Sequence, residues 1–179
     1  MIREFSIKAK PSNGKARTLF ILCMLLAFGL VMISAIIDSY KGIVSVAAVA
    51  FLSLAIVIYT KYLASTYFYD ITFDSEGTPL LVVRQQTGKR HTTLCRIALF
   101  EITKIEQENA KQRREHKTPF DTKKYTYLPS LNPDLSYRIT AWGKYEKAEI
   151  LIEVSEEIAS MLSTYSTEAK SYQMIDDEY

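Results

Sequence analysis

The chain has 179 residues, 48% of them hydrophobic, and a formal net charge of +2. The charge is unevenly divided, because residues 1–18 carry five basic side chains and one acidic, whereas residues 61–179 carry 16 basic and 18 acidic ones. The C-terminal part is therefore slightly acidic, which argues against nucleic-acid binding, and its length allows one compact domain but not two.

The first 18 residues form a basic arm that contains a short strand pattern. Phe5, Ile7 and Ala9 alternate with polar residues, and residues 11–14 (Pro-Ser-Asn-Gly) end the pattern. The arm either adds an edge strand to the domain that follows or lies at the lipid head groups of a membrane. We favour the lipid interpretation at this point.

Residues 19–60 contain two apolar runs, 19–37 and 43–60, and neither run has an acidic or basic side chain. At about 1.5 Å per residue, helices of this length span about 27–29 Å, close to the ~30 Å hydrocarbon core of a bilayer. Neither run shows the polar stripe of a soluble core helix. The short connection makes the helices antiparallel neighbours, so the sequence predicts a transmembrane helical hairpin over residues 19–60.

The positive charges predict the orientation of this hairpin. Five Lys or Arg residues precede the first helix and only Lys41 lies in the connection, and segments rich in Lys and Arg stay in the cytoplasm. We therefore expect a multi-pass protein of the cell membrane with both termini cytoplasmic. The alternative is a cleaved signal peptide, but the first run is long for one and no small-x-small cleavage site follows before Asp38.

Small residues are frequent in both apolar runs, among them Ala27, Gly29, Ala48 and Ala55. Small side chains let helix backbones approach each other closely inside a membrane. We expect them to pack the two helices together, and the alternative is a face for a partner subunit.

From Tyr67 onward the apolar period changes to two, which predicts strands. Turn residues such as Asp74–Gly77 and Thr87–Lys89 separate most of them. Seven strands are expected, at residues 67–73, 80–85, 92–97, 102–108, 124–128, 135–142 and 147–154. Such a series predicts an antiparallel β-sandwich or barrel.

One amphipathic helix follows the strands. Ser155 is suited to its N-cap, and two glutamates follow in the first turn, where the helix dipole favours them. Its apolar face consists of Ile158, Met161, Leu162 and Tyr165. Residues 61–166 thus make up the expected cytoplasmic domain, and residues 167–179 are expected to form a loose acidic tail.

This order of elements resembles the pleckstrin-homology-like (PH-like) domains of bacterial membrane proteins. Residues 99–106 (Leu-Phe-Glu-Ile-Thr-Lys-Ile-Glu) are similar to the start of the family's fourth strand, and Ser155–Tyr165 corresponds to its terminal helix. The resemblance implies an α+β membrane protein, in which a two-helix transmembrane hairpin precedes a seven-stranded antiparallel PH-like β-sandwich or barrel with one C-terminal helix. Function in this family is generally not assigned. Phosphoinositide-binding relatives carry a basic site between the first two strands, whereas residues 74–79 here are acidic, so that mode of recognition is not expected.

Residue types that carry catalysis or bind metals do not cluster in the sequence. His91 and His116 have no Cys or His group around them and are interpreted as solvated surface residues. Cys23 and Cys95 are expected to be free buried thiols. Trp142 is expected to be buried against the neighbouring sheet. We predict no catalytic residue, metal ligand or cofactor, and a site assembled only by folding is the alternative.

The candidate contact surface is a group of basic residues in the long polar connection between the fourth and fifth expected strands and just after it. The group consists of Lys111, Arg113, Arg114, Lys117, Lys123 and Lys124. Glu108, Glu115 and Asp121 dilute its charge, and a plain solvated loop is the interpretation that we favour. The functional alternative is weak contact with anionic lipid head groups or with an acidic partner.

These observations predict a non-enzymatic, membrane-anchored interaction module that binds a protein partner at the inner face of the membrane. The alternative is an accessory subunit of a transporter or membrane enzyme that docks through the hairpin. A third hypothesis, an enzyme, requires carboxylates or histidines that converge in a cleft.

Overall fold

The computed structural model describes residues 2–9, 11–36, 40–143 and 146–176. The chain divides into two compact units, which we call the hairpin unit (Ser12–Ser65) and the β-rich unit (Met1–Pro11 together with Thr66–Tyr179). The β-rich unit therefore combines segments from before and after the hairpin.

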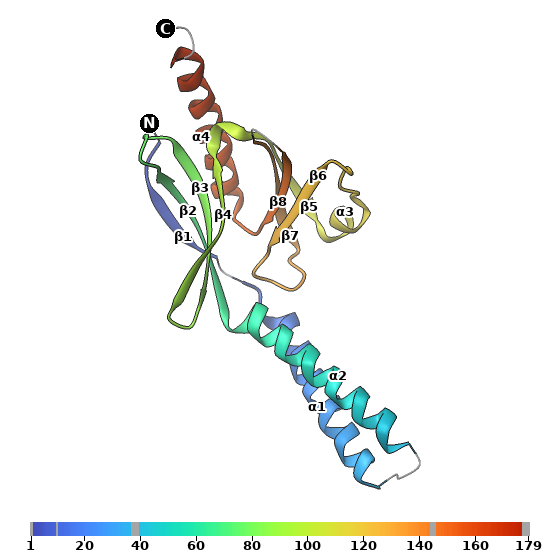
Figure 1. The fold of residues 1–179 in the computed structure, drawn as a ribbon. Coiled ribbons are helices and arrows are strands. Elements are labelled where there is room, and N and C mark those ends of the chain that lie inside the picture. The colour runs from blue at the N-terminus through green and yellow to red at the C-terminus, as the bar shows by residue number, and fades with distance from the viewer. Residues whose placement is uncertain (1, 10, 37–39, 144–145, 177–179) are drawn as a thin grey trace. The chain divides into compact units, whose positions relative to one another are not determined.

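The hairpin unit consists of two apolar helices (Figure 1). Helix α1 spans Gly14–Ile36 and helix α2 spans Lys41–Ile58, and a π-helical turn, η1, extends α2 over Tyr59–Leu63. Both helices are long and apolar enough to cross a membrane. The predicted pair of apolar helices is thus confirmed, and Ile37, the last residue of the first apolar run, lies outside the described residues.

Small residues pack the two helices against each other. Ala16, Cys23 and Ala27 of α1 are buried, as are Ala48 and Ala55 of α2. Their spacing of four to seven residues places them along one face of each helix. The expectation that small residues serve contact within the hairpin is confirmed for Ala27, Ala48 and Ala55.

Large apolar side chains cover the outside of the hairpin. Leu25, Phe28, Ile43 and Val46 each expose more than 60% of their surface. Apolar surface of this extent is unfavourable in water, and monomeric soluble proteins rarely expose so large a patch.

The first sheet of the β-rich unit has the strand order β1-β2-β3-β4. Its strands are β1 (Phe5–Lys8), β2 (Ser65–Phe73), β3 (Pro79–Thr87) and β4 (Arg90–Ala98). Strand β1 pairs with β2 from Phe5 opposite Ile71 to Lys8 opposite Phe68, and the Ala9 amide donates to the Tyr67 carbonyl at 2.9 Å. The edge-strand alternative is therefore the correct one, and the lipid interpretation that we favoured is wrong for this segment.

Tight turns join the strands of this sheet where the sequence predicts them. After β2, the Asp74 carboxylate accepts hydrogen bonds from the amides of Glu76 (2.9 Å) and Thr78 (2.8 Å), and Gly77 has a φ of 80°. Gly88, between β3 and β4, has a φ of 61°. Residues with a Cβ atom rarely adopt such angles, which explains glycine at both positions.

The second sheet has the strand order β5-β7-β8-β6. A 3-10 turn, η2 (Leu99–Glu101), leads from the first sheet into this one. The strands are β5 (Ile102–Asn109), β6 (Thr122–Tyr127), β7 (Leu135–Trp142) and β8 (Lys147–Ile152).

The pairing of β6 differs from the expectation. Strands occur at all seven predicted places, and β1 brings the total among the described residues to eight. However, β6 pairs in parallel with β8, from Thr122 opposite Lys147 to Tyr127 opposite Ile152. The prediction of an entirely antiparallel arrangement is wrong at this pair, because consecutive strands by default pair with each other and nothing in the residue pattern shows that β6 lies at the far edge.

One apolar core joins the two sheets. Tyr69, Ile71 and Val83 enter it from the first sheet, and Ile139 and Ile150 enter it from the second, each at most 1% exposed. The two sheets therefore share one core and form a single folding unit.

Helix α4 (Glu156–Asp176) completes this core. It begins directly after Ser155, as predicted, and it buries Leu162, while the Ser166 hydroxyl donates to the Ile102 carbonyl at 3.1 Å. The helix continues through residues 167–176, where we expected a loose tail, because small residues such as Ala169 extend its buried stripe. Residues 177–179 of that tail lie outside the described part of the chain.

Candidate functional site

The connection between β5 and β6 is held against the outer face of the second sheet, opposite the core. In the order β5-β7-β8-β6 these two strands are the opposite edges, so residues 110–121 have to cross from one edge to the other. The first part of this connection is a short helix, α3 (Ala110–Glu115), visible beside β5 in Figure 1. The polar stretch that we expected to be irregular is thus partly helical.

Asn109 determines where the chain leaves β5 and turns into α3. Its side chain accepts hydrogen bonds from the amides of Lys111 (3.0 Å) and Gln112 (2.9 Å), and the Gln112 side chain accepts one from the Asn109 amide (2.9 Å). This capping box satisfies amides that the first turn of a helix leaves without partners.

Arg113, one of the predicted basic contact residues, fastens α3 to the loop before β7. Its guanidinium donates to the Ser136 hydroxyl at 2.6 Å, to the Pro133 carbonyl at 2.5 Å and to the Asn132 side chain at 3.3 Å. Burial lowers the pKa of Arg113, and the nearby carboxylates of Glu108 and Glu153 raise it by less. This side chain therefore stabilises the connection.

A buried charge network lies beneath the connection. Arg138 of β7 is 1% exposed, and it donates to the two carboxylate oxygens of Glu108 at 2.5 and 2.8 Å and also to Glu149. His116 Nε2 lies 3.1 Å from both carboxylate oxygens of Glu149, and the Thr118 hydroxyl donates to Glu149 at 3.0 Å. The network thus ties β5, β7, β8 and the connection together. The interpretation of His116 as a solvated surface residue is wrong, because its side chain is half-buried against Glu149.

The contacts of Glu149 favour its ionised form. Burial alone raises the pKa of this carboxyl, but the hydrogen bonds with Thr118 and His116 and the charge of Arg138 lower it by more, so that it lies below the ordinary value of 4.5. An ion pair buried with this many hydrogen bonds is consistent with a structural role.

The other predicted basic residues do not gather at one site. Lys111 pairs with Glu115 at 3.9 Å, and Lys123 pairs with Glu146. The remaining three, Arg114, Lys117 and Lys124, are exposed and form no ion pair within the described ranges. Acidic neighbours thus occupy part of the surface that we considered for anionic lipid.

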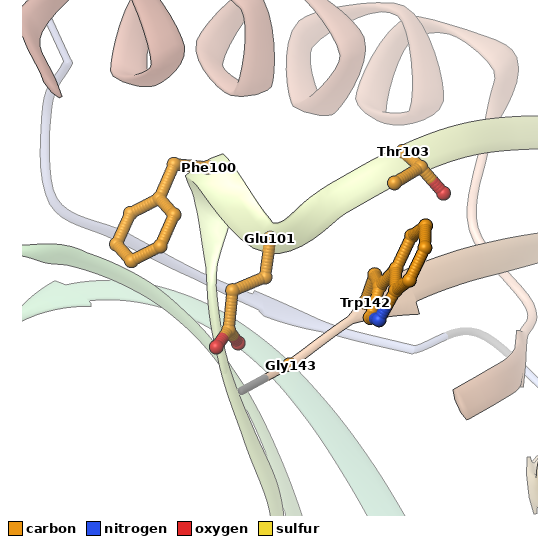
Figure 2. A pocket seen from close by; sticks show the side chains of 5 residues that line it. All are labelled: Phe100, Glu101, Thr103, Trp142 and Gly143. Carbon is orange, nitrogen blue, oxygen red and sulfur yellow. The ribbon is translucent and has the colours of Figure 1, made fainter. Parts of the chain in front are cut away.

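A surface hollow of about 590 Å³ lies at one end of the second sheet. Its lining residues are Phe100, Glu101, Thr103, Trp142 and Gly143 (Figure 2). Trp142 is 62% exposed, so the prediction that it is buried is wrong. The reason is that Trp142 shares the outer face of β7 with Arg138 and Thr140, whereas the alternate residues Ile139 and Ala141 face the core.

The strand register brings Glu101 and Trp142 close together. Ile102 of β5 pairs with Ala141 of the antiparallel strand β7. Glu101 precedes Ile102 and Trp142 follows Ala141, so these two residues are also neighbours. The register shifts between Ile102 and Lys104, and the bulged Thr103 donates its hydroxyl to the Thr140 carbonyl at 3.0 Å. Bulges redirect side chains and are frequent beside functional sites. In Figure 2 the Glu101 carboxylate points towards Gly143, and the indole of Trp142 lies beside Thr103.

Lys147 of β8 holds the indole from outside the hollow. Its ammonium nitrogen lies 4.8 Å from the centre of the Trp142 ring and 3.5 Å from Asp121, and Lys147 is not among the residues that line the hollow. The ring thus has one cation partner already and is held in place at the edge of the hollow.

Other residues with reactive side chains are dispersed. Among the described residues, no group of three or more His, Cys, Asp or Glu side chains is arranged to hold a metal ion. His91 is exposed and lies beside Phe68, with 6.3 Å between the ring centres. Cys23 and Cys95 are both free, and burial raises the pKa of Cys95 although a hydrogen bond with Tyr127 lowers it.

The sequence did not reveal the hollow, because its two halves, residues 100–103 and 142–143, meet only through the pairing of β5 with β7. One feature of the sequence did point to the hollow: Trp142 alternates with the polar residues Arg138 and Thr140, which places it on the polar face of the strand. Comparisons of the chain with protein-family models, with curated proteins and with solved structures give no match. The chain itself shows two apolar helices of membrane-spanning length, followed by a β-rich domain that ends in a helix.

Proposed function

We propose that this protein is a membrane-anchored, non-enzymatic interaction module. Helices α1 and α2 span the cell membrane, and the β-rich unit, of PH-like fold, binds a protein partner on the cytoplasmic side. The observation that carries the proposal is Trp142, a large aromatic side chain that is 62% exposed at the edge of a hollow. Tryptophan is enriched among the residues that dominate binding energy at protein interfaces.

The surface of the hairpin unit supports the membrane anchor. The small residues Ala16, Ala27, Ala48 and Ala55 are buried between the helices, whereas the outward side chains are large and apolar. Close helix association in a membrane depends on small residues at the interface. The outer surface therefore suits lipid tails better than a tightly packed partner helix, which favours the interaction module over the accessory subunit.

The layout of the β-rich unit supports the PH-like proposal in part. Four strands, a longer connection, three strands and a closing helix follow one another in the expected order. The additional strand β1 and the parallel pair of β6 with β8 depart from the expected pattern.

The test is the capture of partners by the full-length protein in its native membrane, before and after Trp142→Ala. The membrane is treated with a cross-linker and solubilised in mild detergent, and the proteins bound to the chain are identified. We expect a specific partner to be lost with Trp142→Ala and retained with Phe73→Ala, which removes a 39% exposed aromatic residue from β2.

A third variant separates the two functional hypotheses. It replaces residues 14–63 with an unrelated two-helix hairpin of the same length. Loss of the partner with this variant, together with retention in Trp142→Ala, would assign the contact to the hairpin and contradict the proposal.

A further inference from the structure

The hollow beside Trp142 combines two chemical features that attract a cation. The Trp142 and Phe100 rings contribute aromatic surface, and the negative face of an indole attracts ammonium and guanidinium groups. Glu101 contributes a half-buried carboxylate that forms no ion pair or hydrogen bond within the part of the chain that the structure describes. The carboxylate at the end of η2 and the aromatic ring at the end of β7 can contact the same cationic group.

The structure itself shows that this indole accepts a cation. The Lys147 ammonium lies 4.8 Å from the ring centre, within the range of cation–π contact. Lys147 is a neighbour of Trp142 in the β7–β8 register and lies outside the lining of the hollow. It therefore does not neutralise the hollow, where the described lining residues include one carboxylate, that of Glu101, and no basic side chain.

We propose that this hollow binds the guanidinium group of an arginine side chain presented by the protein partner. This inference rests on the proposed function and adds the chemistry of recognition to it. Arginine fits better than lysine, because its planar group stacks on an indole and at the same time donates paired hydrogen bonds to a carboxylate. A choline head group fits less well, because a quaternary ammonium has no N–H to donate to Glu101.

The single tryptophan of the chain is itself the probe for this proposal. The full-length protein in nanodiscs is titrated with the peptide acetyl-Ala-Ala-Arg-Ala-Ala-amide while Trp142 fluorescence is recorded. The matched peptide contains citrulline, which has the shape of arginine without its charge. We expect a saturable change with the arginine peptide and binding at least about tenfold weaker with the citrulline peptide, because a hydrogen bond between charged groups is replaced by a neutral one.

Two protein variants identify the carboxylate. Glu101→Gln keeps the size of the side chain and is expected to weaken binding of the arginine peptide about tenfold. Glu106→Gln removes an exposed carboxylate that pairs with Lys104 and lies on β5, the strand that follows Glu101, and it is expected to leave binding unchanged. Equal binding of the two peptides, or equal effects of the two variants, would overturn the proposal. Saturable binding of tetramethylammonium that exceeds binding of the arginine peptide would overturn it as well and assign the hollow to a lipid head group.

The failure of this inference is distinguishable from failure of the proposed function. If cross-linking of the native partner depends on Trp142 but is unaffected by Glu101→Gln, the interaction module stands and arginine recognition is wrong. If the partner is retained in both variants, both proposals are wrong.

Discussion

At the scale of single residues, Arg138 and Trp142 differ sharply in exposure although they lie on the same strand face. Both side chains lie on the outer face of β7, yet Arg138 is 1% exposed and Trp142 is 62% exposed. The difference arises because the connection of residues 110–121 covers the middle of the face and leaves its end open. Contacts from His116, Thr118 and Arg113 keep that connection in place.

The buried charge network predicts a pH dependence of stability. The pKa of Glu149 is lower in the folded protein than in the unfolded chain, where it is about 4.5. The contribution of Glu149 to stability is therefore fully present above pH 4.5, and it is lost as the pH falls through the pKa of the folded state. Glu149→Gln should cost about 1–3 kcal/mol at pH 7, because Arg138, His116 and Thr118 lose a charged partner. The difference between the wild type and the variant should shrink below pH 4.5.

Hydrogen exchange of the β7 and β8 amides in the full-length protein measures this effect. Comparing the variant with the wild type at each pH cancels the contribution of the other carboxyl groups to the pH dependence of stability. One of these is Glu153: burial raises its pKa, and hydrogen bonds from Ser130 lower it by less. A difference that stays constant from pH 7 to pH 3 would show that folding does not lower the pKa of Glu149, and it would contradict this prediction.

At the scale of elements, α4 should be essential to the β-rich unit. Leu162 is 1% exposed in the core, so Leu162→Ala should lower the free energy of unfolding by about 2–5 kcal/mol. Ser163→Ala alters the neighbouring, exposed residue and should change the free energy of unfolding by less than about 0.5 kcal/mol. Urea denaturation of the full-length protein, followed by exchange of the core amides, measures both. Equal stability of the two variants would mean that α4 does not pack as described.

Strand β1 should stabilise the edge of the first sheet. Deletion of residues 2–9 removes the antiparallel partner of β2, so we expect faster hydrogen exchange at β2 amides such as Tyr69 and Ile71. The control is the pair Arg3→Gln and Lys8→Gln, which removes positive charge but keeps the backbone pairing. If the control accelerates exchange as much as the deletion, the arm acts through its charge and not through the strand.

Elements with a strong local pattern could be predicted from the sequence, and their arrangement could not. The two apolar runs, the turns at Gly77 and Gly88 and the start of α4 after Ser155 all follow from local chemistry. The parallel pairing of β6 depends on which edge of the sheet is free, a property of the whole domain. The hollow was missed for the same reason, since Glu101 and Trp142 become neighbours only through strand register.

At the scale of the whole molecule, the membrane topology is open to a direct test. Single cysteines replace Gly42, where a Cβ atom would meet nothing within 4 Å, and the exposed Ser75. Both are made in a protein that lacks Cys23 and Cys95. In intact cells a membrane-impermeant thiol reagent should label position 42 and leave position 75 unlabelled until the cells are lysed. Labelling of position 75 alone would reverse the orientation.

The pairing of β1 with β2 across the inserted hairpin has a practical consequence for protein engineering. Lys8 lies opposite Phe68, and the Ala9 amide bonds to the Tyr67 carbonyl, so the two strands approach each other as they would in an ordinary β-hairpin. A two-residue Asn-Gly turn could therefore replace residues 10–66 and join Ala9 directly to Tyr67. The shortened chain would be a water-soluble form of the β-rich unit that keeps the eight strands found among the described residues, and it would suit crystallisation and solution NMR without detergent.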